Sequence, residues 1–170
     1  MAKGGFGFYP NKGLATLKKG FDTYFKKIKM EKPGGADEQA KIKVAIQMLN
    51  WSLNGSSKEA AVPPIKDGIL RGSGSVFVER KFIADTSGEY PGGTPNKSYN
   101  GKRGQIIIGY NVSYAAKQHQ NLPPFGDFKL GPVSEQSGDV SGGWLTLHLM
   151  HDCKSAMALY ARLLKKLSGG

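Results

Sequence analysis

The spacing of apolar residues changes along this 170-residue chain, and the change limits the folds that the chain can adopt. Helical spacing marks three segments, Leu14 to Ile28, Asp37 to Leu53 and Trp144 to Leu167. Two shorter segments, Ser75 to Phe82 and Gln105 to Tyr110, have the apolar patterns of strands. The sequence therefore predicts an α+β fold with two N-terminal helices, a small antiparallel sheet with long loops, and a long C-terminal helix.

Each predicted helix carries an apolar stripe. The first places its large apolar residues on one face and lysines on the other; the apolar face comprises Leu14, Leu17, Phe21, Tyr24, Phe25 and Ile28. Asp37 is predicted to cap the second helix, whose stripe includes Ala45, Leu49 and Leu53. The apolar side of the C-terminal helix is predicted to comprise Leu147, Met150, Met157, Tyr160, Leu164 and Leu167.

The segments between these elements are long and rich in glycine and proline. They cover Asp85 to Gly104 and Asn121 to Gly143, and a short helix is predicted before the second, from Tyr114 to Gln120. Residues 1–12 are predicted to form a flexible N-terminal arm ahead of a single domain over 13–170. Irregular segments of this length are usually functional, or disordered until they bind a partner. We expect the arm and loops to become ordered against a neighbouring molecule, which favours assembly over catalysis.

The charge of the chain suggests acidic partners. The formal net charge is +11, and lysine supplies most of the positive residues. Such a charge favours nucleic acid, an acidic protein surface or an anionic membrane. Because specific base recognition depends heavily on arginine, the lysine excess indicates a general field rather than sequence recognition. No apolar stretch approaches the length of a membrane span, so we expect no membrane partner and synthesis in a cytoplasm.

Three short motifs carry a resemblance to a known family. They are Pro64-Ile65-Lys66-Asp67-Gly68-Ile69-Leu70-Arg71-Gly72-Ser73, then Tyr110-Asn111-Val112-Ser113-Tyr114-Ala115 with Gln118-His119 behind it, and Gly142-Gly143-Trp144-Leu145. In this order they resemble the tailed-phage head–tail joining family, also called tail-completion, neck or minor capsid proteins. The first motif resembles that family's Pro-x-x-x-Gly-x-Leu-Arg-x-Ser stretch.

The resemblance implies a virion structural protein without enzymatic activity. It implies a homo-oligomeric ring, commonly of six subunits, located in the neck of the virion and made in the host cytoplasm. The implied partners are the head connector or stopper ring, the tail terminator or tail tube, and genomic DNA in the channel. Two alternatives stay open: a tail terminator ring protein, and a basic nucleic-acid-binding protein without sequence preference.

The motif residues have predicted structural roles. Gly68 is expected to take a positive φ, and Leu70 is expected to enter the core. Arg71 is expected to be exposed at the start of a strand, where it contacts a neighbour or forms an intramolecular salt bridge. Ser73 is expected at a turn or sheet edge, and His119 is expected to pack locally. The full set of family-motif residues is Pro64, Gly68, Leu70, Arg71, Ser73, Tyr114, Ala115, His119 and Trp144.

No catalytic, metal or cofactor site is predicted. His148, His151 and Cys153 lie close in sequence, but their spacing does not suit zinc ligation on a helix, and Cys153 is expected to be a small buried apolar residue. Aromatic residues of the arm and cations of the first long loop are the candidates for contacts with a partner or with DNA in a channel. These candidates are Phe6, Phe8, Tyr9, Lys97, Lys102 and Arg103.

Overall fold

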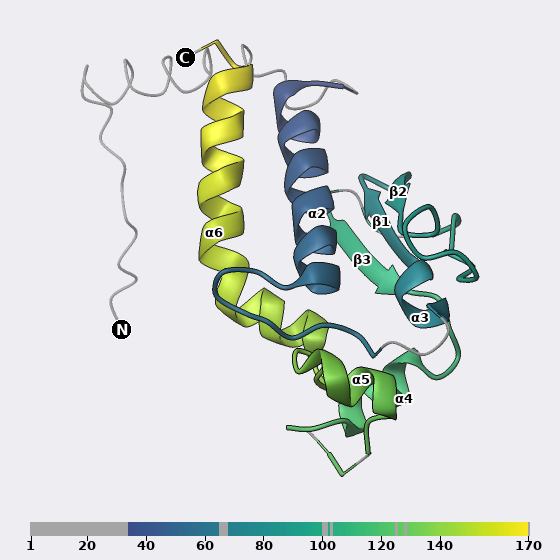
Figure 1. Ribbon diagram of the computed structural model, residues 1–170. Coiled ribbons are helices and arrows are strands. Elements are labelled where there is room, and N and C mark those ends of the chain that lie inside the picture. Colours follow the sequence, from purple (N-terminus) through teal and green to yellow (C-terminus); the bar gives the residue numbers. More distant parts are fainter. Residues whose placement is uncertain are drawn as a thin grey trace, which may run out of the picture.

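The computed structural model describes residues 34–64, 68–99, 102, 104–124, 126–127 and 129–169, and these form an α+β fold. The predicted arm, the first predicted helix and Arg103 lie outside the described residues. The elements follow the chain in the order shown in Figure 1: α2 (Ala36–Asn54), α3 (Ile69–Gly72), β1 (Gly74–Val78), β2 (Lys81–Asp85), β3 (Ile106–Tyr110), α4 (Ala115–Asn121), α5 (Pro132–Ser137) and α6 (Trp144–Leu167).

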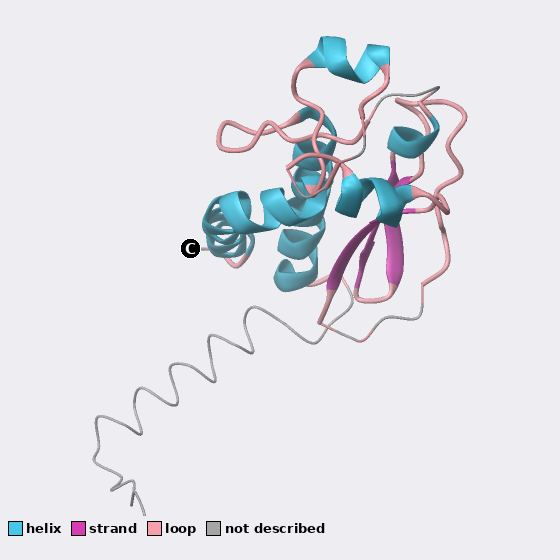
Figure 2. Cartoon of the chain, turned by 90° about the horizontal axis from the view of Figure 1, so that it is seen from below, coloured by secondary structure: helices cyan, strands magenta, loops and turns pink. Residues whose placement is uncertain are grey.

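The helix α2 lies between α6 and the sheet. Figure 1 shows α6 and α2 side by side, with the strands on the other side of α2. Seen from below, the long loop after β2 lies on the opposite side of the sheet from the two long helices (Figure 2). The arrangement explains why α2 is apolar on more than one side, since it has a neighbour on each.

The sheet has three antiparallel strands in the order β2-β1-β3, with β1 in the centre. All five residues of β1 are buried, as a central strand covered on both faces requires. From α2, Ala45, Leu49 and Leu53 pack against Val76 and Val78 of β1. These side chains form the first of two apolar clusters.

The predicted strand from Ser75 to Phe82 is wrong, because the chain turns back within it. Glu79 and Arg80 have φ values of 50° and 70°, and they connect β1 to β2 as a hairpin. Two-residue hairpin turns need positive φ, which glycine or asparagine normally supplies. Here the Glu79 carboxylate accepts hydrogen bonds from Lys41 Nζ and the Gly104 amide, each at 2.7 Å. Those contacts come from distant parts of the chain, so the local sequence does not indicate the turn.

The start of α2 also differs from the prediction. The N-cap residue is Gly35, and Asp37 lies inside the first turn. The Asp37 carboxylate accepts a hydrogen bond from the Tyr160 hydroxyl of α6 and pairs with Lys41 Nζ at 2.8 Å. Burial, followed by this hydrogen bond and the charge of Asp37, raises the pKa of Tyr160 to about 12. Asp37 thus connects two helices instead of capping one.

The long loop after β2 packs on its own chain. Tyr99 packs against Phe77 of β1, with ring centroids 5.6 Å apart and ring planes tilted by 41°. Farther back in the loop, Gly93 lies against Gly72, so closely that a Cβ on Gly72 would be 2.0 Å from the Tyr90 carbonyl oxygen. Residues 86–99 therefore have packing contacts within their own chain, and their ordering against a neighbour stays a prediction.

The second long segment contains structure that the sequence did not predict. Pro132 opens α5, and Gly138 ends it with a left-handed φ of 70°. Past α5, Val140 forms a parallel bridge with Val62. Proline at the start of a helix and glycine at its end are recognised signals, so α5 was detectable from the sequence.

The bounds of α6 match the prediction, and its predicted apolar side is borne out in part, since Leu147, Tyr160, Leu164 and Leu167 are half-buried. The buried residues are Trp144, His148, Asp152 and Ala156, which repeat every four residues. Met150 and Met157, which were expected in the core, are 64% and 65% exposed. The buried side of α6 therefore includes polar residues, and Tyr160 of α6 contacts α2 through a hydrogen bond to Asp37.

We predict that Gly72→Ala destabilises the fold by about 3 kcal/mol, because the new methyl group would displace the loop backbone at Tyr90. Gly109→Ala is the matched control, since nothing lies within 4 Å of its Cβ position. The control is expected to leave stability unchanged or to raise it by about 0.5 kcal/mol. Urea unfolding of both variants measures the difference, and equal midpoints would contradict the close packing of the loop against Gly72 of α3.

Candidate functional site

The described residues of the first motif connect the prolines to the sheet, and most of them are buried. Gly68 has a left-handed φ of 69°, as the sequence predicted, and it precedes α3, which the sequence did not predict. Leu70 is only 2% exposed, which confirms its place in the core. Ser73 is fully buried, and its hydroxyl donates to the Leu70 carbonyl at 2.8 Å. Pro64 is buried as well. The motif therefore acts as a structural corner.

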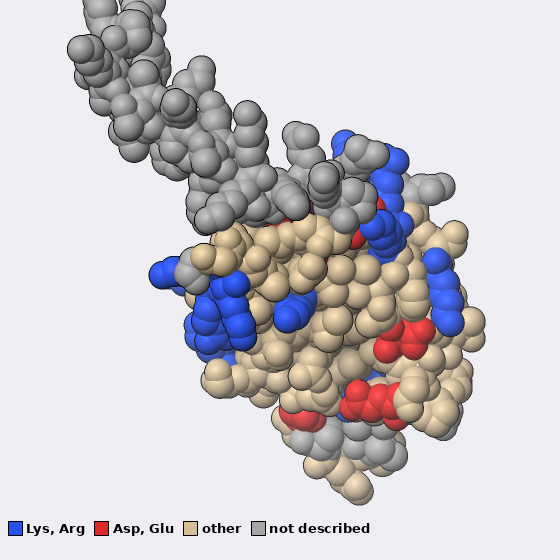
Figure 3. Space-filling view, turned by 90° about the horizontal axis from the view of Figure 1, so that it is seen from above, with Lys and Arg blue, Asp and Glu red and all other residues tan. Residues whose placement is uncertain are grey.

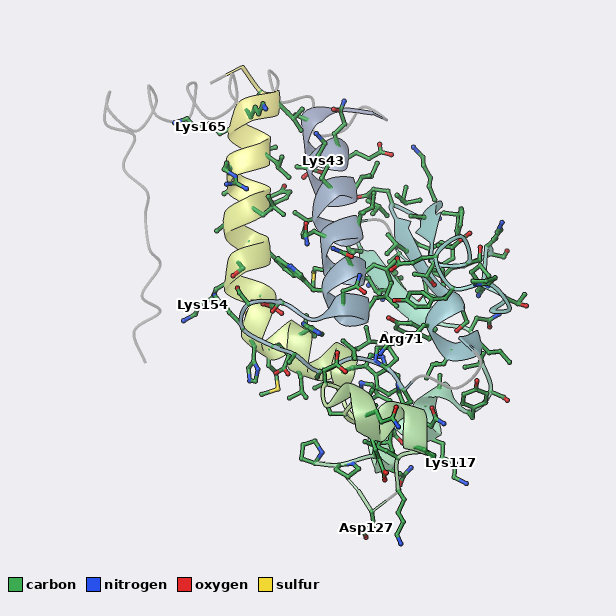
Figure 4. All side chains as sticks on the ribbon, viewed as in Figure 1. Lys43, Arg71, Lys117, Asp127, Lys154 and Lys165 are labelled. Carbon is green, nitrogen blue, oxygen red and sulfur yellow. The ribbon has the colours of Figure 1, made fainter. Side chains whose placement is uncertain are left out.

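Arg71 is not exposed, which corrects the sequence-based expectation. It belongs to α3 and is 7% exposed. Its Nε donates to the Pro63 carbonyl at 3.0 Å, and its Cζ lies 5.8 Å from the centre of the Tyr90 ring. Figure 4 shows Arg71 among interior side chains near the C-terminal end of α2. Its partners are a carbonyl and an aromatic ring, so Arg71 fixes the long loop to the motif corner.

The three motifs meet in space. Leu70 from the first motif, Ala115 from the second and Trp144 from the third belong to one buried cluster. Ala61 and Leu122 complete this second apolar cluster. Residues that are far apart in the sequence thus share one core, and the helices α3, α4 and α6 are held at their starts by the same contacts.

Trp144 lies at the centre of this cluster. The Tyr110 ring packs edge-on against it at 6.1 Å, and the His119 ring does so at 4.9 Å, which confirms the local packing expected for His119. The Trp144 Nε1 and His119 Nε2 atoms are buried and have no hydrogen-bond partner among the described residues. Burial lowers the pKa of His119, because the charged form would be poorly solvated there.

A polar pair replaces the expected apolar contact at the start of α6. His148 Nδ1 lies 2.7 Å from Asp152 Oδ2, and His148 Nε2 lies 2.8 Å from the Ala61 carbonyl oxygen. The Ser56 hydroxyl donates to Asp152 at 2.8 Å. The pair is nearly fully buried and holds the segment after α2 against α6. Its signal in the sequence was the His-x-x-x-Asp spacing, which places both side chains on one face.

The other two residues of the histidine–cysteine group have separate partners. His151 Nδ1 lies 2.5 Å from the Glu59 carboxylate, and the Cys153 thiol donates to the Met150 carbonyl at 3.6 Å. Within the described ranges, no three His, Cys, Asp or Glu side chains are grouped as metal ligands. Cys153 is partly exposed, so the expectation of a buried cysteine is wrong.

The loop cations are only partly available to a partner. Lys97 Nζ lies 3.8 Å from the Asp85 carboxylate and 5.6 Å from the centre of the Phe82 ring, although the Lys97 side chain is 67% exposed, and Lys102 is exposed as well. Tyr114 caps α4 and is 37% exposed. On the face in Figure 3, lysine and arginine side chains form separate groups with acidic residues between some of them. This face does not present a single continuous basic track.

One open groove runs between the two long helices. It is lined by Gln47 and Trp51 of α2 and by Ser155, Ala158, Leu159 and Arg162 of α6. The lining contains a single charged residue, Arg162, and it brings no carboxylate or histidine beside Ser155. These lining residues offer no base to activate a nucleophile.

The comparisons with known proteins find no matching family model, no matching curated protein and no matching solved structure. None of the helices in the described part of the chain has the length and apolar character of a bilayer span.

We predict that Arg71→Lys destabilises the isolated protein by about 1–3 kcal/mol, because lysine cannot keep both the bond to Pro63 and the planar contact with Tyr90. Arg162→Lys on the exposed side of α6 is the control, with an expected change within about 0.5 kcal/mol. Denaturant unfolding measures both. Equal stabilities would mean that the buried contacts of Arg71 do not support the fold.

Acidification should test the environment of His119. Its lowered pKa means that the unfolded chain takes up a proton at higher pH than the folded chain does, so stability falls as pH drops below about 6.5. His119→Gln removes this contribution while His148 and His151 remain. Between pH 7.5 and pH 5, the unmodified chain is expected to lose more stability than the variant. Parallel stability curves would contradict the burial of the imidazole.

Proposed function

We propose that this chain is a virion structural protein of a tailed phage, a ring-forming neck subunit that joins the DNA-filled head to the tail. The observation that carries the proposal is the convergence of the three motif segments on one buried cluster through Leu70, Ala115 and Trp144. Apolar residues of any single domain gather in its core, so the convergence shows that the three motif segments belong to one folding unit. Motifs that form a common core have the behaviour expected of a shared fold.

Because some motif residues are buried, the contacts between ring subunits are proposed at other positions. Arg71 and Ser73 are buried, so they act on the shape of the subunit rather than on a neighbour. The contacts between subunits then belong to exposed positions such as Tyr114 and Lys102, and to the arm with Phe6 and Phe8, which lies outside the described residues. A subunit that makes head-to-tail contacts which close on themselves forms a ring.

A nucleic-acid-binding role is the second candidate, favoured by the net charge of +11. On the face of Figure 3 the cations lie in separate groups, which counts against one continuous DNA track on that face. A protein that neutralises several phosphates binds DNA with a steep dependence on salt. The neck role needs no tight binding by the isolated subunit.

The decisive experiment is electron microscopy of particles made without this protein, with the gene supplied in trans as the control. DNA-filled heads beside finished but unattached tails are expected. Tails of abnormal length would instead favour the tail terminator, because a protein that caps a growing tube limits its length. Normal virions would contradict the neck proposal. Salt-dependent binding of the purified chain to duplex DNA would then support the second candidate.

A further inference from the structure

The helix α6 carries two stripes, and only one is covered by the described residues. The inner stripe, with Trp144, His148 and Ala156, faces the rest of the fold. The second, which we call the outer stripe, comprises Leu149, Met150, Cys153 and Met157. Leu149, Met150 and Met157 are 60%, 64% and 65% exposed, the highest values among the large apolar residues of the described chain.

The outer stripe differs from the other exposed apolar residues. Those are Ile46 on α2, Ile69 on α3, Tyr99 in the long loop and Tyr114 before α4, so they are dispersed over the molecule. Single exposed apolar residues are common, but a contiguous apolar stripe on one helix marks a contact surface. The three exposed side chains of the outer stripe, with the Cys153 thiol between them, span two turns of α6.

We propose that residues 14–28 of the same chain pack on the outer stripe as a third long helix. The route of the chain supports this occupant. The Tyr160 hydroxyl bonds to Asp37, so the start of α2 lies beside the C-terminal half of α6 (Figure 1). Residues 1–33 therefore join the described fold next to the helix that carries the stripe.

The lengths agree with this placement. A helix over 14–28 would be about 22 Å long, similar to the stretch of α6 from residue 146 to residue 160. The connection over residues 29–35 can span up to about 23 Å. This reach exceeds the diameter of a helix, about 10–12 Å, so the connection is long enough to cross α6. This connection contains Lys32-Pro33-Gly34-Gly35, a sequence that ends a helix and reverses the chain. The new helix would run parallel to α6 and antiparallel to α2.

The side chains of the two surfaces are chemically suited. The stripe predicted on residues 14–28 includes Phe21, Tyr24 and Phe25, and aromatic rings make favourable contacts with methionine sulfur. No residue of the outer stripe is charged, so no charge would lose its solvation. The lysines of residues 14–28 would face water on the opposite side. Lys154 of α6 extends away from α2 beside this region (Figure 4), which disfavours the lysine face as the contact.

The native Cys153 allows a direct test, because it is the only cysteine in the chain. Phe21→Cys places a second thiol on the apolar side of residues 14–28, near the expected level of Cys153. Lys19→Cys, two residues away on the opposite side of the predicted helix, is the matched control. In dilute full-length protein under mild oxidation, the intramolecular disulfide is expected to form about tenfold faster in the Phe21 variant, as followed by non-reducing gel mobility and mass.

Three results of the disulfide test would overturn the proposal. Equal rates in the two variants would mean that the segment is only a loose tether, and the absence of any disulfide would place it elsewhere. Covalent dimers would show that a second copy covers the stripe. Because the test concerns one chain, its result does not depend on whether the chain works in a phage neck.

A stability measurement provides an independent check. If the outer stripe is covered, Met157→Lys in the full chain should lower the thermal midpoint by about 4 °C or more. Ile46→Lys is the control, because Ile46 is an exposed apolar residue outside the stripe. Equal and negligible shifts in the two variants would contradict burial of the stripe.

Discussion

The fold depends on α2, which packs against the sheet on one side and against α6 on the other. One side of α2 supplies Ala45 and Leu49 to the sheet, and another side faces α6, where Asp37 binds Tyr160. Ion pairs strengthen the contact with the sheet, since Lys41 reaches Glu79 and Lys81 of β2 reaches Glu38. Because α2 is enclosed in this way, the positions of the hairpin and of α6 are coupled through one helix.

Around Trp144, buried polar groups hold the segments together as much as apolar packing does. Arg71 binds the Pro63 carbonyl, and His148 binds both Asp152 and the Ala61 carbonyl. The bonds to Pro63 and Ala61 satisfy carbonyl groups of the irregular segment between α2 and α3. A buried irregular backbone needs such partners, because an unpaired carbonyl away from water is costly. These polar contacts allow a long non-helical connection to lie under the cluster around Trp144.

The helix α6 has apolar residues on two sides. A helix with apolar residues on two sides is expected to contact structure on both. The described residues occupy one side of α6 and leave Leu149, Met150 and Met157 exposed.

The sequence by itself determined the fold class, the positions of α2, β3 and α6, and the core location of Leu70, because these follow from apolar spacing within short windows. The positive φ of Gly68 was likewise a local matter. Only the tertiary structure decided the turn at Glu79, the inward direction of Arg71 and the buried face of α6. In each case the deciding partner is distant in sequence: Lys41 and Gly104 for Glu79, Tyr90 for Arg71, and Ala61 for His148. Local patterns cannot reveal such contacts, since their free energy arises only when the chain has folded.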